Sequence, residues 1–312
     1  MQLLDVENLQ TSYHSHGRIL RAVDDVSFTV GKGETVGLVG ESGCGKSTLG
    51  KTILRLVPSS AGQIRFSGAD IAPLSGKALI PYRRRMQMIF QDPFGSLNPR
   101  QTVRTLLDTA LKVHRLGDVT ERTRRINETI DRVGLPRTAL SRYPHEFSGG
   151  QRQRIGIARA LILEPELIVC DEPVSALDVS IQAQILNLLV DLKRDLGLSY
   201  LFISHDMSVV RYFTDRVLVM YLGRIVESGS YETLWSNPRH PYTRALIDAV
   251  PSYDAQKKRT AVVLKGDLPS ASQVPSGCRF RLRCRFAQER CSDEEPALRR
   301  MPSGQSVACH FA

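Results

Sequence analysis

The pattern of apolar and polar positions along the chain predicts alternating strands and helices. Strands are predicted from short apolar runs and longer mixed segments, at residues 3–13, 20–30, 34–39, 63–66, 86–90, 167–170 and 200–203. Helical patterns occur at residues 46–56, 102–163 and 180–196. Because strands alternate with helices, the predicted fold class is α/β, with a mainly parallel core sheet covered by helices and an antiparallel β part.

Three features subdivide this α/β pattern. Residues 102–163 carry helical periodicity without an intervening strand, which predicts a helical insertion within the α/β domain. Residues 217–229 predict a terminal hairpin with its turn near Gly223. After two short helices, a charged linker is predicted over Tyr253–Thr260, followed by a tail rich in proline, glycine, arginine and cysteine. The tail predicts a small C-terminal extension.

Composition narrows the class of protein. Apolar residues make up 42% of the 312 residues, which is enough for one or two buried cores. No run approaches the ~20 apolar residues that span a bilayer, and residues 1–5 do not begin a signal peptide, so we expect a soluble cytoplasmic protein. The net charge of +10 is dispersed. This favours a solvated or membrane-proximal face over a nucleic-acid site, so no nucleic-acid partner is expected.

The strongest local motif is a glycine-rich loop that fits the pattern G-x-x-x-x-G-K-[ST] and directly follows a predicted strand. Such a loop turns backbone N–H groups toward phosphate oxygens, and the next helix adds its partial positive charge. A lysine charge and a serine hydroxyl, which can ligate Mg²⁺, complete a nucleotide site. The loop comprises Gly40, Glu41, Ser42, Gly43, Cys44, Gly45, Lys46, Ser47 and Thr48.

Two carboxylates follow the buried strand predicted at residues 167–170. Asp171 stands at the end of that strand, where it can hold Mg²⁺ through water. Glu172 is one residue further on and can orient and polarise an attacking water molecule. Together with the phosphate-binding loop, the pair predicts hydrolysis of a nucleoside triphosphate.

A second glycine-bearing sequence opens the predicted helix at residues 152–163. Its serine and two glycines form another anion-binding helix N-terminus. One nucleotide cannot easily use this site and the loop at residues 40–48 of the same chain, so we interpret the motif as acting on the nucleotide of a neighbouring subunit. The residues concerned are Ser148, Gly149, Gly150 and Gln151, preceded by Phe147.

Taken in order, these motifs resemble the nucleotide-binding domain of ABC transporters, over residues 1–235. Residues 40–48 resemble its Walker A element, residues 167–172 its Walker B element, and residues 147–151 its LSGGQ signature with phenylalanine first. The resemblance implies a P-loop ATPase fold, ATP and Mg²⁺ as ligands, and two domains that sandwich two ATP molecules.

Four further positions take their roles from this resemblance alone. Tyr13 matches the aromatic residue that stacks on adenine, and Gln91 matches the glutamine that senses metal and water and faces the membrane subunit. Asp178 belongs to the D-loop, and His205 matches the switch histidine that contacts the γ-phosphate. With Glu172 also present, the resemblance implies an active ATPase.

Two segments narrow the resemblance to the oligopeptide/dipeptide/nickel branch of ABC importers, namely residues 95–99 and 237–243. Residues 94–97 resemble the second ATPase subunit of such systems, which usually pairs with a different ATPase. The branch implies a C-terminal extension over residues 236–312, two membrane permease subunits, an extracytoplasmic substrate-binding protein, and a peripheral position on the cytoplasmic face of the inner membrane.

The C-terminal extension contains four of the six cysteines, spaced C-x5-C-x6-C-x17-C. Thiols stay reduced in the cytosol, so disulfides are not expected, and three alternatives remain: an iron–sulfur cluster, a structural zinc ion, or unligated thiols. The importer branch carries a [4Fe–4S] cluster in this region, which favours the cluster. Its ligands would be Cys278, Cys284, Cys291 and Cys309, with the arginines at residues 279–285 offsetting negative charge.

The alternative class of protein is a soluble ABC-type ATPase that acts on nucleic acid or ribosomes. Such proteins usually carry tandem ATPase domains, coiled coils or inserted zinc modules. The present sequence contains one set of ATPase motifs and no coiled-coil pattern. The transporter is therefore the expected function, and its substrate is not readable from this chain.

Overall fold

The computed structural model describes residues 2–15, 18–250, 266–271 and 273–312, and the predicted linker at Tyr253–Thr260 lies outside them. The chain divides into two compact units. The first unit comprises Met1–Pro73 and Phe202–Ala312, and the second comprises Leu74–Leu201.

The first unit contains the antiparallel β part. Its sheet has the order β2-β1-β4-β5, with every neighbouring pair antiparallel. The strands are β1 (Gln2–Ser15), β2 (Arg18–Gly31), β4 (Ala61–Phe66) and β5 (Ala69–Asp70). Side chains such as Leu4, Val6 and Ile64 are buried, so one face of this sheet packs in the core of the unit. The antiparallel part of the predicted fold class is confirmed.

A second group of strands in this unit carries the glycine-rich loop. β3 (Thr35–Val39) is fully buried and pairs in parallel with β9 (Arg216–Tyr221). β9 forms the predicted hairpin with β10 (Arg224–Ser230), and the turn at Leu222 and Gly223 has positive φ angles. β12 (Ser306–Val307) and β11 (Arg299–Arg300) extend the order to β11-β12-β10-β9-β3, so the end of the chain joins the same sheet.

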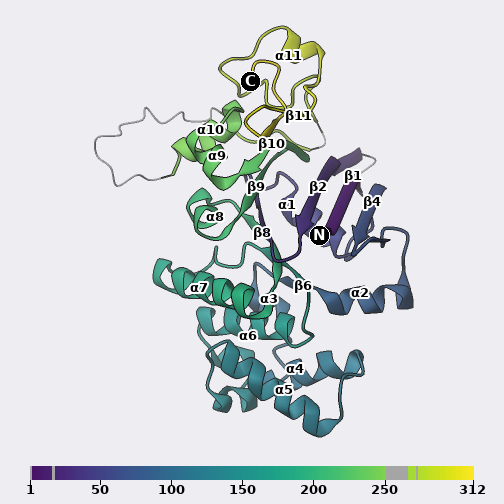
Figure 1. Cartoon of the computed structure of the whole chain (residues 1–312), viewed down its shortest axis with the longest axis vertical. Helices are drawn as coiled ribbons and strands as arrows, with labels where there is room; N and C mark the ends of the chain where they lie inside the picture. Colours follow the sequence, from purple (N-terminus) through teal and green to yellow (C-terminus); the bar gives the residue numbers. More distant parts are fainter. Residues whose placement is uncertain (1, 16–17, 251–265, 272) are drawn as a thin grey trace. The chain divides into compact units, whose positions relative to one another are not determined.

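The helices of the first unit are α1 (Lys46–Ile53), α8 (Met207–Phe213), α9 (Tyr231–Ser236), α10 (Pro241–Asp248) and α11 (Arg290–Asp293) (Figure 1). α1 is shorter than the predicted helix at residues 46–56. It ends at Ile53 with Leu54 as its C-cap residue, and Arg55 has a left-handed φ of 55° that a continuing helix cannot include.

The second unit combines a parallel strand pair with helices. β6 (Met86–Ile89) and β7 (Leu167–Asp171) are parallel, with Ile89 opposite Cys170, and β8 (Ser199–Ser204) begins in this unit. α2 (Ile80–Arg85) and α3 (Pro93–Ser96) correct the prediction, which treated the first hundred residues as strands and turns apart from the helix at 46–56. Because both are short, neither shows two turns of helical periodicity.

Three helices occupy the region with predicted helical periodicity: α4 (Val103–Val113), α5 (Val119–Arg132) and α6 (Gly149–Leu161). Short 3₁₀ turns, η2 (Arg137–Ser141) and η3 (Pro144–Glu146), connect α5 to α6. Leu107, Ile130 and Ile155 are fully buried where these helices pack together. A 3₁₀ turn, η1 (Gly76–Leu79), and α7 (Val179–Leu196) complete the unit.

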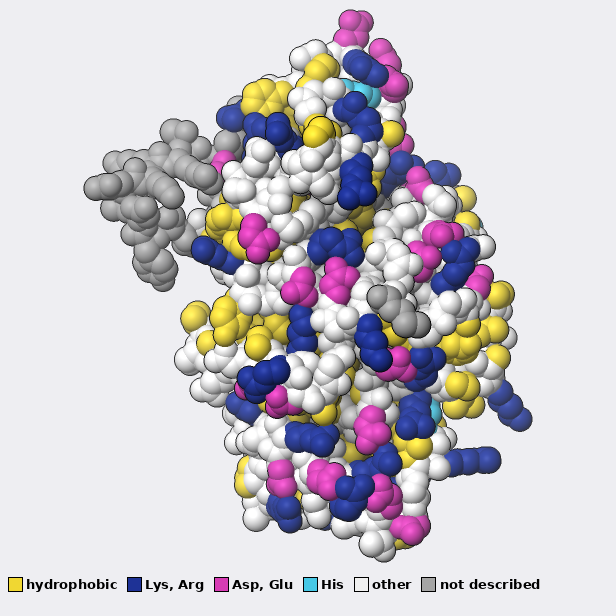
Figure 2. Space-filling model, viewed as in Figure 1, with side chains coloured by type: hydrophobic (Ala, Val, Ile, Leu, Met, Phe, Trp, Pro, Cys, Tyr) yellow, Lys and Arg dark blue, Asp and Glu magenta, His cyan; other side chains and the backbone are white. Residues whose placement is uncertain are grey.

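Charged side chains are dispersed on the face of the molecule drawn in Figure 2. On the face drawn in Figure 2, Lys and Arg are scattered among Asp and Glu, and no large area carries basic side chains alone. This arrangement is typical of a solvated surface in which both signs of charge are interspersed.

Candidate functional site

The glycine-rich loop connects β3 to α1 in the first unit, and two of its glycines occupy positions that exclude any side chain. Gly40 has a φ of 154°, and a Cβ atom there would lie 2.2 Å from the carbonyl oxygen of Met220. Gly45 has a φ of 113°, and its Cβ would lie 2.1 Å from the carbonyl oxygen of Ala22. Both the left-handed backbone and the close approach require glycine. The loop is therefore a tightly folded backbone, as phosphate binding needs.

Lys46 places a positive charge within this loop. Its side chain is 4% exposed, and Nζ donates hydrogen bonds to the carbonyl oxygens of Gly40 at 2.8 Å and Glu41 at 2.9 Å. Gly45, the N-cap residue of α1, provides no side chain to cap the first turn. The ammonium group and the helix N-terminus thus both favour an anion at the loop.

The other predicted residues of the first unit lie on different elements. Ser47 and Thr48 are half-buried on the first turn of α1, while Ser42 and Gly43 are exposed in the loop. Tyr13 lies on β1 and is 39% exposed, so part of its ring is accessible to a planar ligand. His205 follows β8 and is exposed.

The carboxylates of the second unit lie where β6 and β7 end. Asp171 and Glu172 are 4% and 9% exposed, and Glu172 has a left-handed φ of 45°. Because β6 and β7 are parallel neighbours, their carboxyl ends meet at one edge, which brings Gln91 to Glu172. The Nε2 atom of Gln91 donates a hydrogen bond of 3.0 Å to Oε2 of Glu172. The sequence placed both residues in one site, but nothing in it predicted this contact.

The signature sequence forms the N-terminus of α6 with a reciprocal cap. The backbone N–H of Gln151 donates to Oγ of Ser148 at 3.4 Å, and the N–H of Ser148 donates to Oε1 of Gln151 at 3.1 Å. The helix therefore starts three residues before the predicted Arg152. The cap is a structural reason for serine at position 148 and glutamine at position 151. It does not account for the two glycines between them.

Gly149 and Gly150 are pressed against the segment that contains Asp178. A Cβ at Gly150 would lie 2.5 Å from Cγ2 of Ile181, and one at Gly149 would lie 3.3 Å from Cδ2 of Leu177. Asp178 is exposed at the N-cap position of α7, and its side chain makes no capping hydrogen bond there. The second unit thus brings the signature and the D-loop together.

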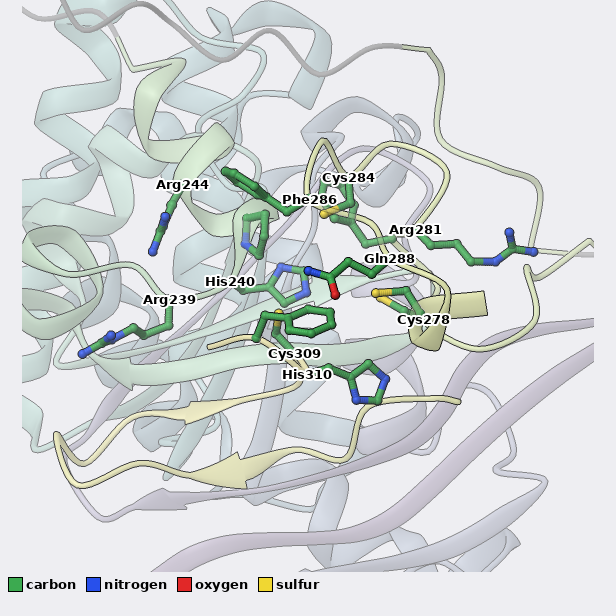
Figure 3. Close-up of a pocket in the computed structure, with 14 residues that line it drawn as sticks. Arg239, His240, Arg244, Cys278, Arg281, Cys284, Phe286, Gln288, Cys309 and His310 are labelled. Atoms are coloured by element: carbon green, nitrogen blue, oxygen red, sulfur yellow. The ribbon is translucent and has the colours of Figure 1, made fainter. Parts of the chain in front are cut away.

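The four cysteines of the C-terminal extension line one pocket of about 280 Å³ (Figure 3). Cys278, Cys284, Cys291 and Cys309 are all free thiols. Burial, together with the neighbouring thiols, raises the pKa of Cys278 to about 11. No group of three or more His, Cys, Asp or Glu side chains within residues 2–15, 18–250, 266–271 and 273–312 is arranged to hold a metal ion. The four cysteines thus line one pocket, but among the described residues they are not arranged to coordinate a single metal ion.

The arginines between these cysteines were expected to offset thiolate charge, but two of them pair with carboxylates. Arg279 pairs with Asp24 and Glu295, and Arg283 pairs with Glu41. Burial raises the pKa of Cys284, and Arg285 opposes that shift only weakly. Two of the arginines therefore connect the extension to other parts of the first unit.

The contact between Arg283 and Glu41 was missed by sequence reasoning, as was a hydrogen bond between the N–H of Glu41 and the hydroxyl of Tyr242. Both partners lie more than 200 residues from Glu41 in the sequence, and no motif marks them. None of the helices in the described part of the chain combines the length and apolar character needed to cross a bilayer.

The fold and these residues define an α/β P-loop nucleoside triphosphatase. A model of the family described as "ABC transporter" matches residues 23–175, and a model described as "Oligopeptide/dipeptide transporter, C-terminal region" matches residues 226–291. The chain belongs to the ATP-binding proteins of ABC transporters and is an ATPase. The resemblance inferred from the motifs is thereby confirmed.

Individual relatives and a solved structure support the same family assignment. A putative peptide import ATP-binding protein of Brucella ovis is 53% identical over 307 residues, covering 98% of this chain and 97% of that protein. The oligopeptide transport ATP-binding protein AppF of Bacillus subtilis is 52% identical, covering 94% and 90% of the two chains. The structure of cbiO1 from Clostridium perfringens, part of the ABC transporter complex cbiONQ, matches with a TM-score of 0.67 and 28% identity, covering 76% of this chain and 91% of that one.

Proposed function

We propose that this chain is the ATP-hydrolysing subunit of an ABC importer for oligopeptides. One observation carries the proposal: the chain matches peptide-import ATP-binding proteins over 98% of its length, including the region after residue 226 that characterises oligopeptide and dipeptide transporters. The ATPase and the peptide-type extension are thus joined in one chain. Nothing in the comparisons favours a nucleic-acid or ribosomal ATPase.

The residues of the loop and of the carboxylate pair carry the chemistry. Residues 40–48 would hold the ATP phosphates through backbone N–H groups and Lys46. Ser47 and Asp171 would hold Mg²⁺, which offsets the charge of the phosphates. Glu172 is the general base for the attacking water, and the hydrogen bond from Gln91 holds its carboxylate in one orientation.

The remaining site residues act around this chemistry. Tyr13 stacks on adenine and His205 contacts the γ-phosphate. Ser148 and the two glycines after it bind the nucleotide of the neighbouring ATPase subunit, with Asp178 contributing from the adjoining D-loop. The support for this arrangement is that signature and D-loop are packed together by Gly150 and Ile181.

The partners follow from the same proposal. A second, different ATPase subunit completes the pair, two permease subunits form the membrane pathway, and an extracytoplasmic binding protein delivers the peptide. The chain sits on the cytoplasmic face of the inner membrane, with its ATPase domain at residues 1–235, including the helical insertion at 102–163, and its extension at 236–312.

The test is ATP hydrolysis by the complete transporter in proteoliposomes. Addition of the binding protein loaded with an oligopeptide is expected to raise turnover above the level seen with the unloaded binding protein. Purified DNA and ribosomes are the matched controls and are expected to leave turnover unchanged. Stimulation by either of these, without stimulation by peptide, would contradict the transport function.

We further propose that the four cysteines of the pocket hold a [4Fe–4S] cluster. The donor set suits it, because four thiolates are the usual ligands of such clusters. The volume of about 280 Å³ is many times the roughly 15 Å³ that a single water molecule needs, so the pocket has room for a polyatomic group. A tetrahedral zinc site draws sulfur atoms to ~2.3 Å from one centre, which needs a tighter arrangement.

Protein purified without exposure to air is expected to be brown and to contain about four iron atoms per chain. Cys284→Ser or Cys291→Ser should remove the colour and loosen the extension, because metal binding organises a segment that is too small for its own core. Cys44→Ala is the control, since that thiol lies in the phosphate-binding loop, and it should keep the iron. Stoichiometric zinc without iron would overturn the cluster.

A further inference from the structure

Glu41, the second residue of the phosphate-binding loop, is bound by two residues of the C-terminal extension. Its backbone N–H donates a hydrogen bond of 2.8 Å to the hydroxyl of Tyr242 on α10. Its carboxylate accepts two hydrogen bonds from Arg283, at 2.6 Å from Nη1 and 3.0 Å from Nη2. All three residues belong to the first unit. The extension therefore contacts both the backbone and the side chain of one loop residue.

The pair between Arg283 and Glu41 differs from an ordinary surface ion pair. The Arg283 side chain is 7% exposed and the Glu41 side chain 26% exposed, so solvent screens the interaction little. Two parallel N–H···O bonds also fix the relative orientation of the two groups. Burial alone would lower the pKa of Arg283, but the bonds with Glu41 raise it overall. The guanidinium therefore stays charged when bound.

The segment that carries Arg283 is fixed by a backbone hydrogen bond and by the packing of a buried aromatic ring. The backbone N–H of Arg283 donates to the carbonyl oxygen of Phe280 at 3.0 Å. The Phe280 ring is 3% exposed and packs against Tyr221, Tyr242 and His240, with ring centroids 5.2 to 5.5 Å apart. Arg283 and Tyr242 thus approach Glu41 from one packed aromatic cluster, and neither is a loosely placed surface side chain.

Glu41 also connects these contacts to the lysine that binds phosphate. Its carbonyl oxygen accepts a hydrogen bond from Nζ of Lys46 at 2.9 Å, and the N–H of Cys44 donates to the same oxygen at 3.3 Å. The orientation of the Glu41 peptide therefore affects both the position of the ammonium group and the turn of the loop. A change at Glu41 reaches the phosphate-binding groups directly.

We propose that Arg283 and Tyr242 are positioning residues for the phosphate-binding loop, acting through Glu41, so that the nucleotide affinity of this ATPase depends on its C-terminal extension. The inference rests on the ATP-binding role of the loop. It adds to that role two residues outside the ATPase motifs, which act through Glu41.

Isothermal titration of the full chain with Mg²⁺–ADP tests the proposal. Arg283→Gln removes the bidentate pair and is expected to weaken binding about tenfold, within the range of coupling energies between contacting residues. Arg283→Lys keeps the charge but loses the paired geometry. Its affinity for ADP should lie between those of Arg283→Gln and the wild type. Arg285→Gln is the matched control, because it removes an exposed guanidinium two residues away, and it should bind within about twofold of the wild type.

A double-mutant cycle shows whether Arg283 acts through Glu41. Glu41→Gln alone should weaken binding about as much as Arg283→Gln, and the double variant should be no weaker than either single one. Tyr242→Phe, which removes only the acceptor of the Glu41 N–H, supplies a variant that keeps the aromatic packing and should also weaken binding. Additive effects in the cycle would overturn the proposed route.

Kinetics of the assembled transporter separate positioning from a general loss of structure. Arg283→Gln should raise KM for ATP and leave kcat close to the wild-type value, because the catalytic carboxylate lies in the other unit and is unchanged. A fall in kcat at constant KM, or unchanged ADP affinity in Arg283→Gln, would refute the positioning role. Failure of the wild-type chain to bind ADP would instead contradict the ATP-binding role itself.

Discussion

Replacement of Glu172 by glutamine is expected to reduce ATP turnover by about 10²- to 10⁴-fold, the usual contribution of a general base. Glutamine matches glutamate in shape, and its Oε1 atom can still accept the hydrogen bond that Gln91 donates at 3.0 Å. The side chain is 9% exposed, so the substitution removes a buried charge without opening a cavity. The fold and the affinity for ATP should therefore persist while hydrolysis stops, and the ATP-bound dimer should accumulate.

The measurement is phosphate release by the complete transporter, together with the population of nucleotide-bound dimer. Glu164→Gln is a suitable control, because Glu164 lies in the same unit and is exposed, with an ion pair to Arg125. Its turnover should equal that of the wild type. Full turnover in Glu172→Gln would show that another group activates the water.

Replacement of Ser148 by aspartate is expected to abolish transport-coupled hydrolysis, with a loss of about 100-fold or more. Aspartate is as good an N-cap residue as serine, so its carboxylate can accept the N–H of Gln151 and α6 should remain intact. If the signature binds a neighbour's ATP, the new carboxylate faces the phosphates of that ATP, and like charges in contact cost several kcal/mol. ATP binding to the isolated chain should be unchanged.

Ser148→Thr is the matched control, since it keeps a hydroxyl cap and adds no charge. It should retain most of the activity of the wild type. Melting temperatures of both variants establish that α6 is preserved. Equal turnover of Ser148→Asp and the wild type in the assembled transporter would exclude the shared nucleotide site, and so would full activity of the isolated chain at high dilution.

The sequence predicted the elements and residues whose signals are local. The loop at residues 40–48 is a contiguous motif between a strand and a helix, and the structure places Gly40 and Gly45 where no side chain fits. The hairpin turn at Gly223 is also encoded within a few neighbouring residues. The start of α6, in contrast, was predicted three residues too late, at Arg152. Short elements escaped prediction: α3 has 4 residues and begins at a proline, which resembles a turn.

Contacts between distant segments could not be predicted from one sequence. The bond between Gln91 and Glu172 depends on the parallel pairing of β6 and β7, which no residue of either strand specifies alone. The close approach of Ile181 requires glycine at position 150, and Arg283 pairs with Glu41. Both contacts exist only in the folded chain. The cysteine spacing predicted a [4Fe–4S] site; the four cysteines line one pocket in the structure, and the cluster itself stays a prediction.

The pairing of Glu41 with Arg283 has a consequence for protein synthesis. Residues 242 positions apart must meet, and β12 at Ser306–Val307 must still be added to β10. During translation at roughly 5–20 residues per second, Arg283 is made at least about ten seconds after Glu41. A nascent chain therefore has its phosphate-binding motif long before it has the contacts that hold the loop, and it should gain full nucleotide affinity only after its C-terminal end has left the ribosome.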